Sequence, residues 1–145
     1  MGKKRIITGG DGQPDSDKKG AEVSSAKNKR QVLKGTIYIT SSYNNTIVSV
    51  TDPKGAVFAW ATAGSLGFKG ARKSTPYAAT LVAKEATERA KKAGFQEGRI
   101  IIRGIGPGRE AAIRGVVSTG ITISSIVDDT PQPHNGVRPP KPRRV

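Results

Sequence analysis

The stretch from Ala63 to Ser74, AGSLGFKGARKS, contains residue types that bind phosphate. It holds Lys69, Arg72 and Lys73 together with glycines and one aromatic residue, and it has no acid. Glycine lets the backbone approach a phosphate closely, and basic side chains neutralise the phosphate charge. The stretch runs into a predicted helix at Thr75-Pro76, where free N–H groups and the helix dipole favour anions. Phosphate binding is therefore favoured over an ordinary solvated basic loop, and the candidate residues are Lys69, Gly70, Arg72, Lys73 and Ser74.

A second glycine-rich stretch, Arg103 to Arg109 (RGIGPGR), joins a predicted strand to a predicted helix, which is where a dinucleotide-binding turn lies. The dinucleotide fingerprint has its third glycine one position later, where Arg109 stands. A P-loop is excluded too, because Arg72 replaces the glycine required before Lys73. Arg103, Arg109 and the nearby Arg114 favour a nucleic-acid phosphate over a nucleotide pyrophosphate. A plain tight turn is the alternative. The candidates here are Arg103, Gly106, Gly108, Arg109 and Arg114.

Two further segments could contact bases. Tyr43-Asn44-Asn45 lies at a predicted hairpin tip, where Tyr can stack on unpaired bases and Asn can hydrogen-bond to them, although turn chemistry alone also explains these residues. The C-terminal segment is kept extended by five prolines between Pro131 and Pro142. His134, the chain's single histidine, has no rigid partner there, so RNA contact suits it better than general-base catalysis. The candidates in this arm are His134, Asn135, Arg138, Lys141, Arg143 and Arg144.

The composition agrees with a nucleic-acid partner. The 145 residues include 25 Lys and Arg against 11 Asp and Glu, a formal net charge of +14. A polyanionic partner best explains such an excess, because it opposes compaction by self-repulsion. The absence of cysteine and the single histidine exclude disulfides, zinc fingers and multi-histidine metal sites. Only five acids lie between residues 31 and 127, too few for a two-metal nuclease. We therefore expect no enzyme activity, no cofactor and no small-molecule substrate.

The sequence shows no sign of a membrane partner. No run approaches the roughly 18 apolar residues that a membrane helix needs. The basic start Lys3-Lys4-Arg5 is not followed by the apolar core of a secretory signal. We expect a cytoplasmic location.

The hydrophobic pattern predicts the elements that position these segments. Alternation and β-branched residues predict strands at 36–40, 46–51 and 56–62, joined by turns at 42–45 and 52–55. Helical spacing predicts a helix from Thr75-Pro76 to Gly94, with Ala79, Val82, Ala83, Ala86 and Ala90 on its apolar face. Further predictions are a strand at 100–102, a helix at 107–119 and a strand at 121–127. The order βββαβαβ implies a mixed α/β sheet of about five strands with helices packed on it.

The pattern also predicts what is buried. Both faces of the strand at 56–62 are apolar, so we expect both to be covered. Phe58, Trp60 and Phe95 are assigned to the core, and Ala112, Ile113, Val116 and Val117 to the apolar stripe of the second helix.

Three regions are expected along the chain. Residues 1–30 hold eight basic and four acidic residues and no aromatic one, which predicts a flexible extension. Residues 31–129 carry the pattern of a globular α/β RNA-binding domain. Residues 130–145 form the predicted extended, basic and proline-rich arm.

Four segments resemble, in order, the motifs of one known family. The run from Ile126 to Lys141 (IVDDTPQPHNGVRPPK) closely resembles the C-terminal signature of the universal S-eleven family of small-subunit ribosomal proteins. Segments 43–48 (YNNTIV), 69–76 (KGARKSTP) and 104–109 (GIGPGR) resemble its other motifs. The resemblance covers roughly residues 31–145, and the His-Asn-Gly and Arg-Pro-Pro-Lys ending is similar to the bacterial branch.

The resemblance implies a ribonuclease H-like fold without the nuclease site. It implies binding of 16S-type ribosomal RNA in the small-subunit platform, near the messenger RNA exit path and beside small-subunit proteins seven, eighteen and twenty-one. By this analogy, the loop Lys69 to Ser74 and the turn Gly106 to Arg109 clasp RNA backbone, and the arm threads into RNA. The N-terminus is longer and more acidic than is usual in bacterial members, which leaves the role of residues 6–26 open. The alternatives are a degenerate ribonuclease H-like nuclease and a free-standing RNA-binding regulator.

Overall fold

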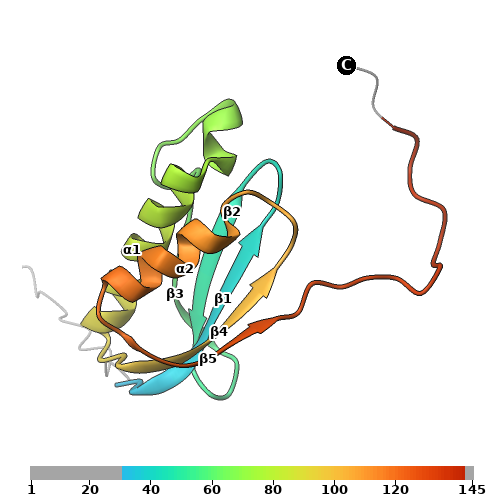
Figure 1. The fold of residues 1–145 in the computed structure, drawn as a ribbon. Coiled ribbons are helices and arrows are strands. Elements are labelled where there is room, and N and C mark those ends of the chain that lie inside the picture. Colours follow the sequence, from blue (N-terminus) through green and yellow to red (C-terminus); the bar gives the residue numbers. More distant parts are fainter. Residues whose placement is uncertain (1–30, 143–145) are drawn as a thin grey trace, which may run out of the picture.

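A computed structural model describes residues 31–142 of the chain. The predicted extension 1–30, together with Arg143 and Arg144 of the predicted arm, lies outside the described residues. The described elements follow the predicted order βββαβαβ, so the predicted mixed sheet with helices packed on it is confirmed (Figure 1). They are β1 (Lys34–Ser41), β2 (Thr46–Thr51), β3 (Val57–Thr62), a 3-10 turn η1 (Gly70–Ser74), α1 (Pro76–Lys92), β4 (Glu97–Arg103), α2 (Arg109–Ser118) and β5 (Thr122–Asp128).

The sheet brings the ends of four strands to one side of the molecule. The strand order is β3-β2-β1-β4-β5, with antiparallel pairing of β2 to both β1 and β3 and parallel pairing of β4 to both β1 and β5. β1, β3, β4 and β5 therefore run in the same direction, and their carboxyl ends share one edge of the sheet. We call this the carboxyl edge.

α1 begins and ends where the sequence predicts. The Thr75 hydroxyl accepts a hydrogen bond from the Ala78 amide at 3.3 Å, and Pro76 occupies the first helical position, where its missing N–H costs nothing. Gly94 follows the helix with φ of +93°, a left-handed conformation that glycine adopts without strain. The predicted apolar face is fully buried: Ala79, Val82, Ala83, Ala86 and Ala90.

Both helices pack on the same face of the sheet, and this corrects the expectation that both faces of β3 are covered (Figure 1). Among the described residues no element covers the other face, and the Trp60 side chain is 52% exposed there. Trp60 was therefore wrongly assigned to the core. Phe95 is buried as predicted, and Phe58 is half-buried against it, with ring centroids 5.9 Å apart.

The second helix is shorter than predicted and buries a narrower stripe. It starts at Arg109 rather than Pro107, and Ala112 and Val116 are fully buried. Ile113 is half-buried, but Val117 is 54% exposed, so its assignment to the buried stripe is wrong. The reason is that α2 lies beside α1 and leaves β5, at the border of the sheet, without a helix over it. Within residues 31–142, no helix is long and apolar enough to cross a membrane.

Candidate nucleic-acid interface

The candidate segments meet at the carboxyl edge. The hairpin tip follows β1, the basic loop follows β3, the Arg103–Arg109 turn follows β4 and the arm follows β5. Backbone hydrogen bonds tie three of them together: the Ala63 amide donates to the Thr46 carbonyl (3.2 Å), and the Gly106 amide donates to the Ser41 carbonyl (3.0 Å). The chain thus gathers the hairpin tip, the basic loop and the turn at one edge of the body, and the arm leaves from the same edge (Figure 1).

Some side chains of the hairpin tip stabilise the turn, and others make no hydrogen bond within the described chain. The Ser42 hydroxyl accepts from the Asn44 and Asn45 amides, and the Asn45 side-chain oxygen accepts from the Thr46 amide at 2.9 Å. Asn45 therefore stabilises the turn itself. Tyr43 is 68% exposed, and neither its side chain nor that of Asn44 makes a hydrogen bond to another described residue. These two side chains are the ones free to meet bases.

The basic loop is anchored at its start and open at its end. The Phe68 amide donates to the Ala63 carbonyl at 3.1 Å, and Leu66 and Phe68 pack against the core. Gly67 and Gly70 have φ of +86° and +59°, and an added Cβ at either would meet no atom within 4 Å. Glycine is thus required here by backbone conformation, and the space beside it is open.

The positive charges of this loop have no internal counterpart. Lys69 and Arg72 are exposed, and Lys73 is half-buried in η1. None of the three forms an ion pair with any residue of the described part of the chain. A hollow of about 360 Å³ lies between the apolar Leu66 and Phe68 and the basic Lys69 and Arg72. The loop therefore offers unneutralised charge beside an open backbone, which is the arrangement that a phosphate group requires.

The Arg103–Arg109 turn uses its glycines differently. Gly106 and Gly108 are buried beneath the turn. A Cβ on Gly106 would lie 2.3 Å from the Ser42 carbonyl oxygen, and a Cβ on Gly108 would lie 2.7 Å from the Thr46 hydroxyl oxygen. These glycines let the turn pack against the hairpin, so the surface of the turn is formed by the exposed Ile105 and Pro107.

The arginines around this turn are paired with acids. Arg103 pairs with Asp129, Arg109 with Asp128, and Arg114 with Glu110 at 3.5 Å. Arg109 also donates to the Gly104 carbonyl at 2.8 Å. Each of these three predicted phosphate ligands therefore has an internal carboxylate partner, unlike the basic residues of the loop.

Asp128 lies at the base of the arm and holds it to the body. The Thr130 hydroxyl donates to its carboxylate at 2.5 Å, and Arg109 contacts the other carboxylate oxygen. The hydrogen bond from Thr130, and after it the one from Arg109, lower the pKa of Asp128 below its ordinary value of 3.8. Asp128 is thus fully charged at neutral pH, and these contacts stay formed.

The arm leaves the body as predicted. Residues 131–142 have neither helix nor strand structure, and all of them are exposed (Figure 1). Asn135 has φ of +54°, a left-handed conformation that asparagine tolerates better than most residues. The side chains of His134, Arg138 and Lys141 make no hydrogen bond or ion pair within the described chain. The arm therefore offers its polar groups to a partner.

The sequence reasoning missed two exposed features near this surface. Tyr77 is 69% exposed at the start of α1 and packs edge-on against Phe68, with ring centroids 6.3 Å apart. Its position outside the apolar stripe of the helix was a signal that could have identified it. Arg99 lies on the open sheet face in the strand next to Tyr38, and Trp60 shares that face. This placement follows from the strand register, which the sequence alone does not give.

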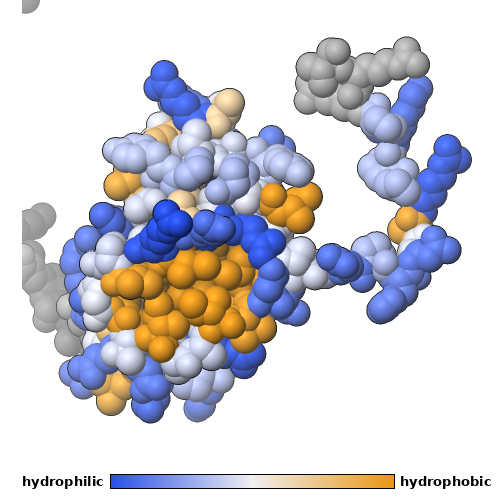
Figure 2. Space-filling view, viewed as in Figure 1, coloured by the Kyte–Doolittle hydropathy of each residue, from blue (hydrophilic) through white to orange (hydrophobic). Residues whose placement is uncertain are grey.

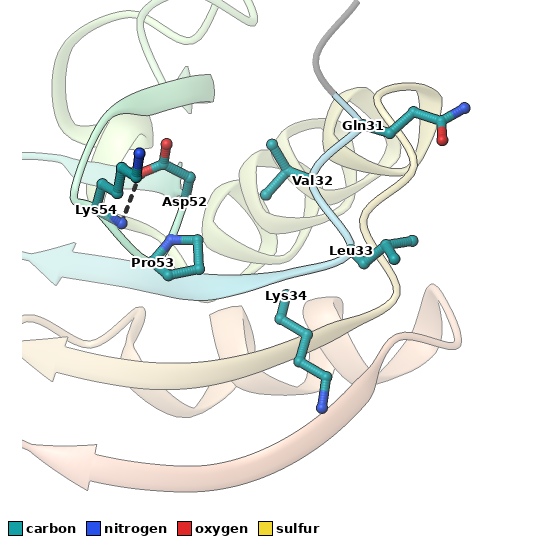
Figure 3. A pocket seen from close by; sticks show the side chains of 7 residues that line it. All are labelled: Gln31, Val32, Leu33, Lys34, Asp52, Pro53 and Lys54. Carbon is teal, nitrogen blue, oxygen red and sulfur yellow. Dashed lines mark hydrogen bonds between the residues drawn. The ribbon is translucent and has the colours of Figure 1, made fainter.

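The opposite edge of the sheet carries no comparable chemistry. A hollow of about 630 Å³ lies there between the start of β1 and the β2–β3 turn (Figure 3). Its one carboxylate, on Asp52, accepts from the Lys54 and Ala56 amides, and Lys34 pairs with Glu97 at 2.8 Å. Across residues 31–142, no group of three or more His, Cys, Asp or Glu residues could hold a metal ion.

Comparisons with known proteins agree on one family. Residues 35–144 match the family described as Ribosomal protein S11. The chain is 50% identical over 130 residues to the small ribosomal subunit protein uS11 of Wigglesworthia glossinidia brevipalpis, covering 90% of this chain and 99% of that protein. It is 54% identical over 119 residues to the uS11 of Aquifex aeolicus (strain VF5), covering 82% of this chain and 95% of that protein. Both relatives are bacterial, and the predicted resemblance is confirmed.

Proposed function

This chain belongs to the ribosomal protein S11 family, and from that premise we propose that its carboxyl edge binds 16S-type ribosomal RNA in the platform of the small subunit. The family makes the chain a structural, non-enzymatic component of the small ribosomal subunit, with ribosomal RNA and other ribosomal proteins as partners. The finer location follows the family resemblance: near the messenger RNA exit path, beside small-subunit proteins seven, eighteen and twenty-one.

The observation that carries the proposal is the uneven charge of the carboxyl edge. Lys69, Arg72 and Lys73 have no ion pair among the described residues, whereas the arginines of the neighbouring turn do. Phosphate contacts that release counterions contribute much of the affinity of a basic protein for RNA. The unpaired loop charges therefore hold RNA backbone, and Tyr43 and Asn44 meet bases beside them.

The arm and the body have different roles in the proposed RNA binding. We propose that residues 31–129 form the folded RNA-binding body and that residues 130–145 form an arm that follows an RNA groove. Prolines restrict the conformations of the arm before binding, which lowers the entropy lost when it docks. Arg138 and Lys141 are exposed and unpaired within the described chain, so their charges are free to contact phosphates. In the sequence, Arg143 and Arg144 continue the run of basic residues.

A charge-removal experiment tests whether the basic loop binds the RNA backbone. The triple variant Lys69→Gln, Arg72→Gln, Lys73→Gln should bind a central-domain fragment of small-subunit ribosomal RNA about tenfold or more weakly at physiological salt. The slope of log affinity against log salt should fall by about two to three, because three phosphate contacts are lost. Filter binding across a salt series measures both quantities.

A matched control removes equal charge elsewhere. The variant Lys34→Gln, Lys54→Gln, Lys92→Gln also lowers the net charge by three, at positions near the opposite edge of the sheet. This control should change the salt slope by less than about one unit, because distant charges are screened. Equal losses in both triple variants would contradict a localised interface and leave only a diffuse effect of net charge.

A further inference from the structure

We propose that the hollow beside the basic loop holds the base of one unpaired RNA nucleotide, while the cations at its rim hold phosphates of the same strand. Such a site rests on the proposed function, because it lies in the loop that we assign to the RNA backbone. We call this space the loop hollow. Its lining residues are Leu66, Gly67, Phe68, Lys69 and Arg72.

One wall of the loop hollow is apolar and aromatic. Leu66 and Phe68 pack against the core, but both are only half-buried, so part of each side chain stays open to the hollow. A loop that binds only phosphates needs charge and an open backbone, and an apolar wall adds to neither. An aromatic ring beside an opening is what an unstacked base requires, since such bases stack on aromatic side chains.

Contacts within the chain fix this wall before any ligand arrives. The Leu66 amide donates to the Thr62 carbonyl at 3.3 Å, and the Phe68 amide donates to the Ala63 carbonyl at 3.1 Å. The Tyr77 ring packs edge-on against the Phe68 ring, with an angle of 82° between the ring planes. Because the Phe68 ring is already held in place, little side-chain entropy is lost when a base stacks on it.

The loop hollow has the volume that one base needs. It measures about 360 Å³. A cavity of about 150 Å³ already admits benzene, and pockets for small molecules begin at about 300 Å³. A base of one or two rings therefore fits, whereas a base that is paired and stacked inside a duplex does not reach it. The ligand is thus a nucleotide that is unpaired or turned out of its stack.

The rim of the loop hollow carries unneutralised charge. Lys69 and Arg72 are exposed, and neither forms an ion pair with any residue from 31 to 142. A nucleotide carries both a flat aromatic base and an anionic phosphate, so it matches the wall and the rim together, whereas an acidic peptide matches the rim alone. Figure 2 shows strongly hydrophilic and mildly hydrophobic residues side by side at the top of the body, where η1 lies in Figure 1.

A neighbouring hollow shows that the apolar wall alone does not make the site. It measures about 320 Å³ and shares Leu66 and Phe68 with the loop hollow. Its rim, however, carries Glu85 and Glu88 together with Lys84. Carboxylates repel a phosphate, which raises the cost of bringing an RNA strand close. Charge therefore directs the nucleotide to the loop hollow.

A double-mutant cycle between protein and RNA tests the proposal. The probe is a central-domain fragment of small-subunit ribosomal RNA in which one unpaired nucleotide at a time is made abasic. At one position, the missing base should weaken binding of the full chain about tenfold. With Phe68→Leu, the same RNA change should weaken binding less than about twofold, because the stacking surface is already removed. Independent losses at every position, measured by filter binding, would overturn the proposal.

A matched control separates the aromatic wall from general packing. Phe68→Leu should itself weaken binding of the unaltered RNA about tenfold, while the salt slope changes by less than about 0.5 unit, because no cation is lost. Phe58→Leu removes another half-buried ring, which packs against Phe95 instead, and should leave the affinity within about twofold of the original. Urea denaturation shows whether both variants still unfold cooperatively. Equal affinities of the two folded variants for the RNA would contradict a base site at Phe68.

Photocrosslinking in assembled small subunits tests the same site without removing the ring. With p-benzoylphenylalanine in place of Phe68, photolysis should join the chain to one nucleotide of the ribosomal RNA. Primer extension should map the link to a nucleotide that chemical probing shows to be unpaired. A link to a paired nucleotide, a link to protein alone, or no link in subunits that contain the variant would overturn the proposal.

The salt slope separates a failure of this proposal from a failure of the proposed function. If Lys69→Gln lowers the slope by about one unit but no abasic position is coupled to Phe68, the loop binds phosphates and the loop hollow holds no base. If the coupling is found but the slope of the triple variant is unchanged, the base site stands and the phosphate contacts are wrong.

Discussion

Two glycine-rich basic stretches lie at the carboxyl edge on either side of the β1–β2 hairpin, and they behave differently. In the loop from Ala63 to Ser74, an added Cβ at Gly67 or Gly70 meets open space, and the basic side chains have no ion pair among residues 31–142. In the Arg103–Arg109 turn, the glycines are crowded by the hairpin and the arginines are paired with carboxylates. Similar composition thus leaves charge and space open in one stretch and serves packing in the other.

The difference between the two stretches shows that glycine and arginine in a sequence do not by themselves indicate a phosphate-binding surface. Glycine has two uses, a left-handed conformation and a close approach of chains. Gly104 combines both, with φ of +98° and an added Cβ 2.1 Å from the Ser41 carbonyl oxygen, so only glycines such as Gly67 and Gly70, whose added Cβ meets no atom, leave space for a ligand. Arginine likewise presents more unneutralised charge to a phosphate where no internal carboxylate contacts its guanidinium. Both distinctions depend on neighbours that are distant in sequence, such as Ser42 for Gly106 and Asp128 for Arg109.

The largest expected effect is on stability. Gly106→Ala should lower the free energy of unfolding by about 3 kcal/mol or more, because its Cβ would overlap the Ser42 carbonyl oxygen. Gly70→Ala should cost about 1 kcal/mol, since only the left-handed conformation is strained. Urea denaturation of the full chain measures both. Similar losses of unfolding free energy in the two variants would contradict the distinction between a crowded and an open glycine.

A smaller effect concerns the paired arginines. The double variant Arg109→Gln, Asp128→Asn removes one ion pair without changing the net charge. The salt slope of RNA binding should change by less than about 0.5 unit, because the pair already neutralises itself. The single variant Lys69→Gln should lower the slope by about one unit and serves as the reference. A fall of about one unit in the double variant would mean that Arg109 leaves Asp128 for a phosphate.

The smallest effect is a response to acid at the base of the arm. The pKa of Asp128 is lowered on folding, so its contacts with Thr130 and Arg109 are fully present above pH 3.8. These contacts should be lost as the pH falls through the lowered pKa that Asp128 has in the folded chain. The amide resonance of Thr130, which donates to Asp128 at 3.1 Å, should report this titration by NMR. Asp128→Asn should abolish the transition, and a midpoint at or above 3.8 would contradict the assignment.

Much of the fold could be predicted because its signals are local. β2 has the predicted bounds, 46–51, since its β-branched residues stand between two turns. The Asp52 side chain accepts from the Lys54 and Ala56 amides in the predicted turn, and Thr75 caps α1 as its residue type indicates. Each of these features depends on contacts within a few residues. Periodicity and capping therefore determine them before the chain is folded.

The predictions that failed depend on which face of an element meets another element. Trp60 and Val117 are apolar residues in apolar patterns, and both are more than half exposed. A pattern states that a residue is apolar, but not whether a helix lies over it. That depends on the direction in which both crossovers pass and on how far two helices reach across five strands.

From the amino-acid order alone one can derive the succession of the elements, the excess of positive charge, the lack of cysteine and the motifs of the S11 family. The tertiary structure decided which glycines are crowded, which arginines are neutralised, and which apolar residues remain in water. The two kinds of feature differ in the sequence separation over which their interactions act. Backbone preferences and turn hydrogen bonds act over a few residues, whereas packing and ion pairing join residues that are far apart in the chain, as Arg103 and Asp129 are.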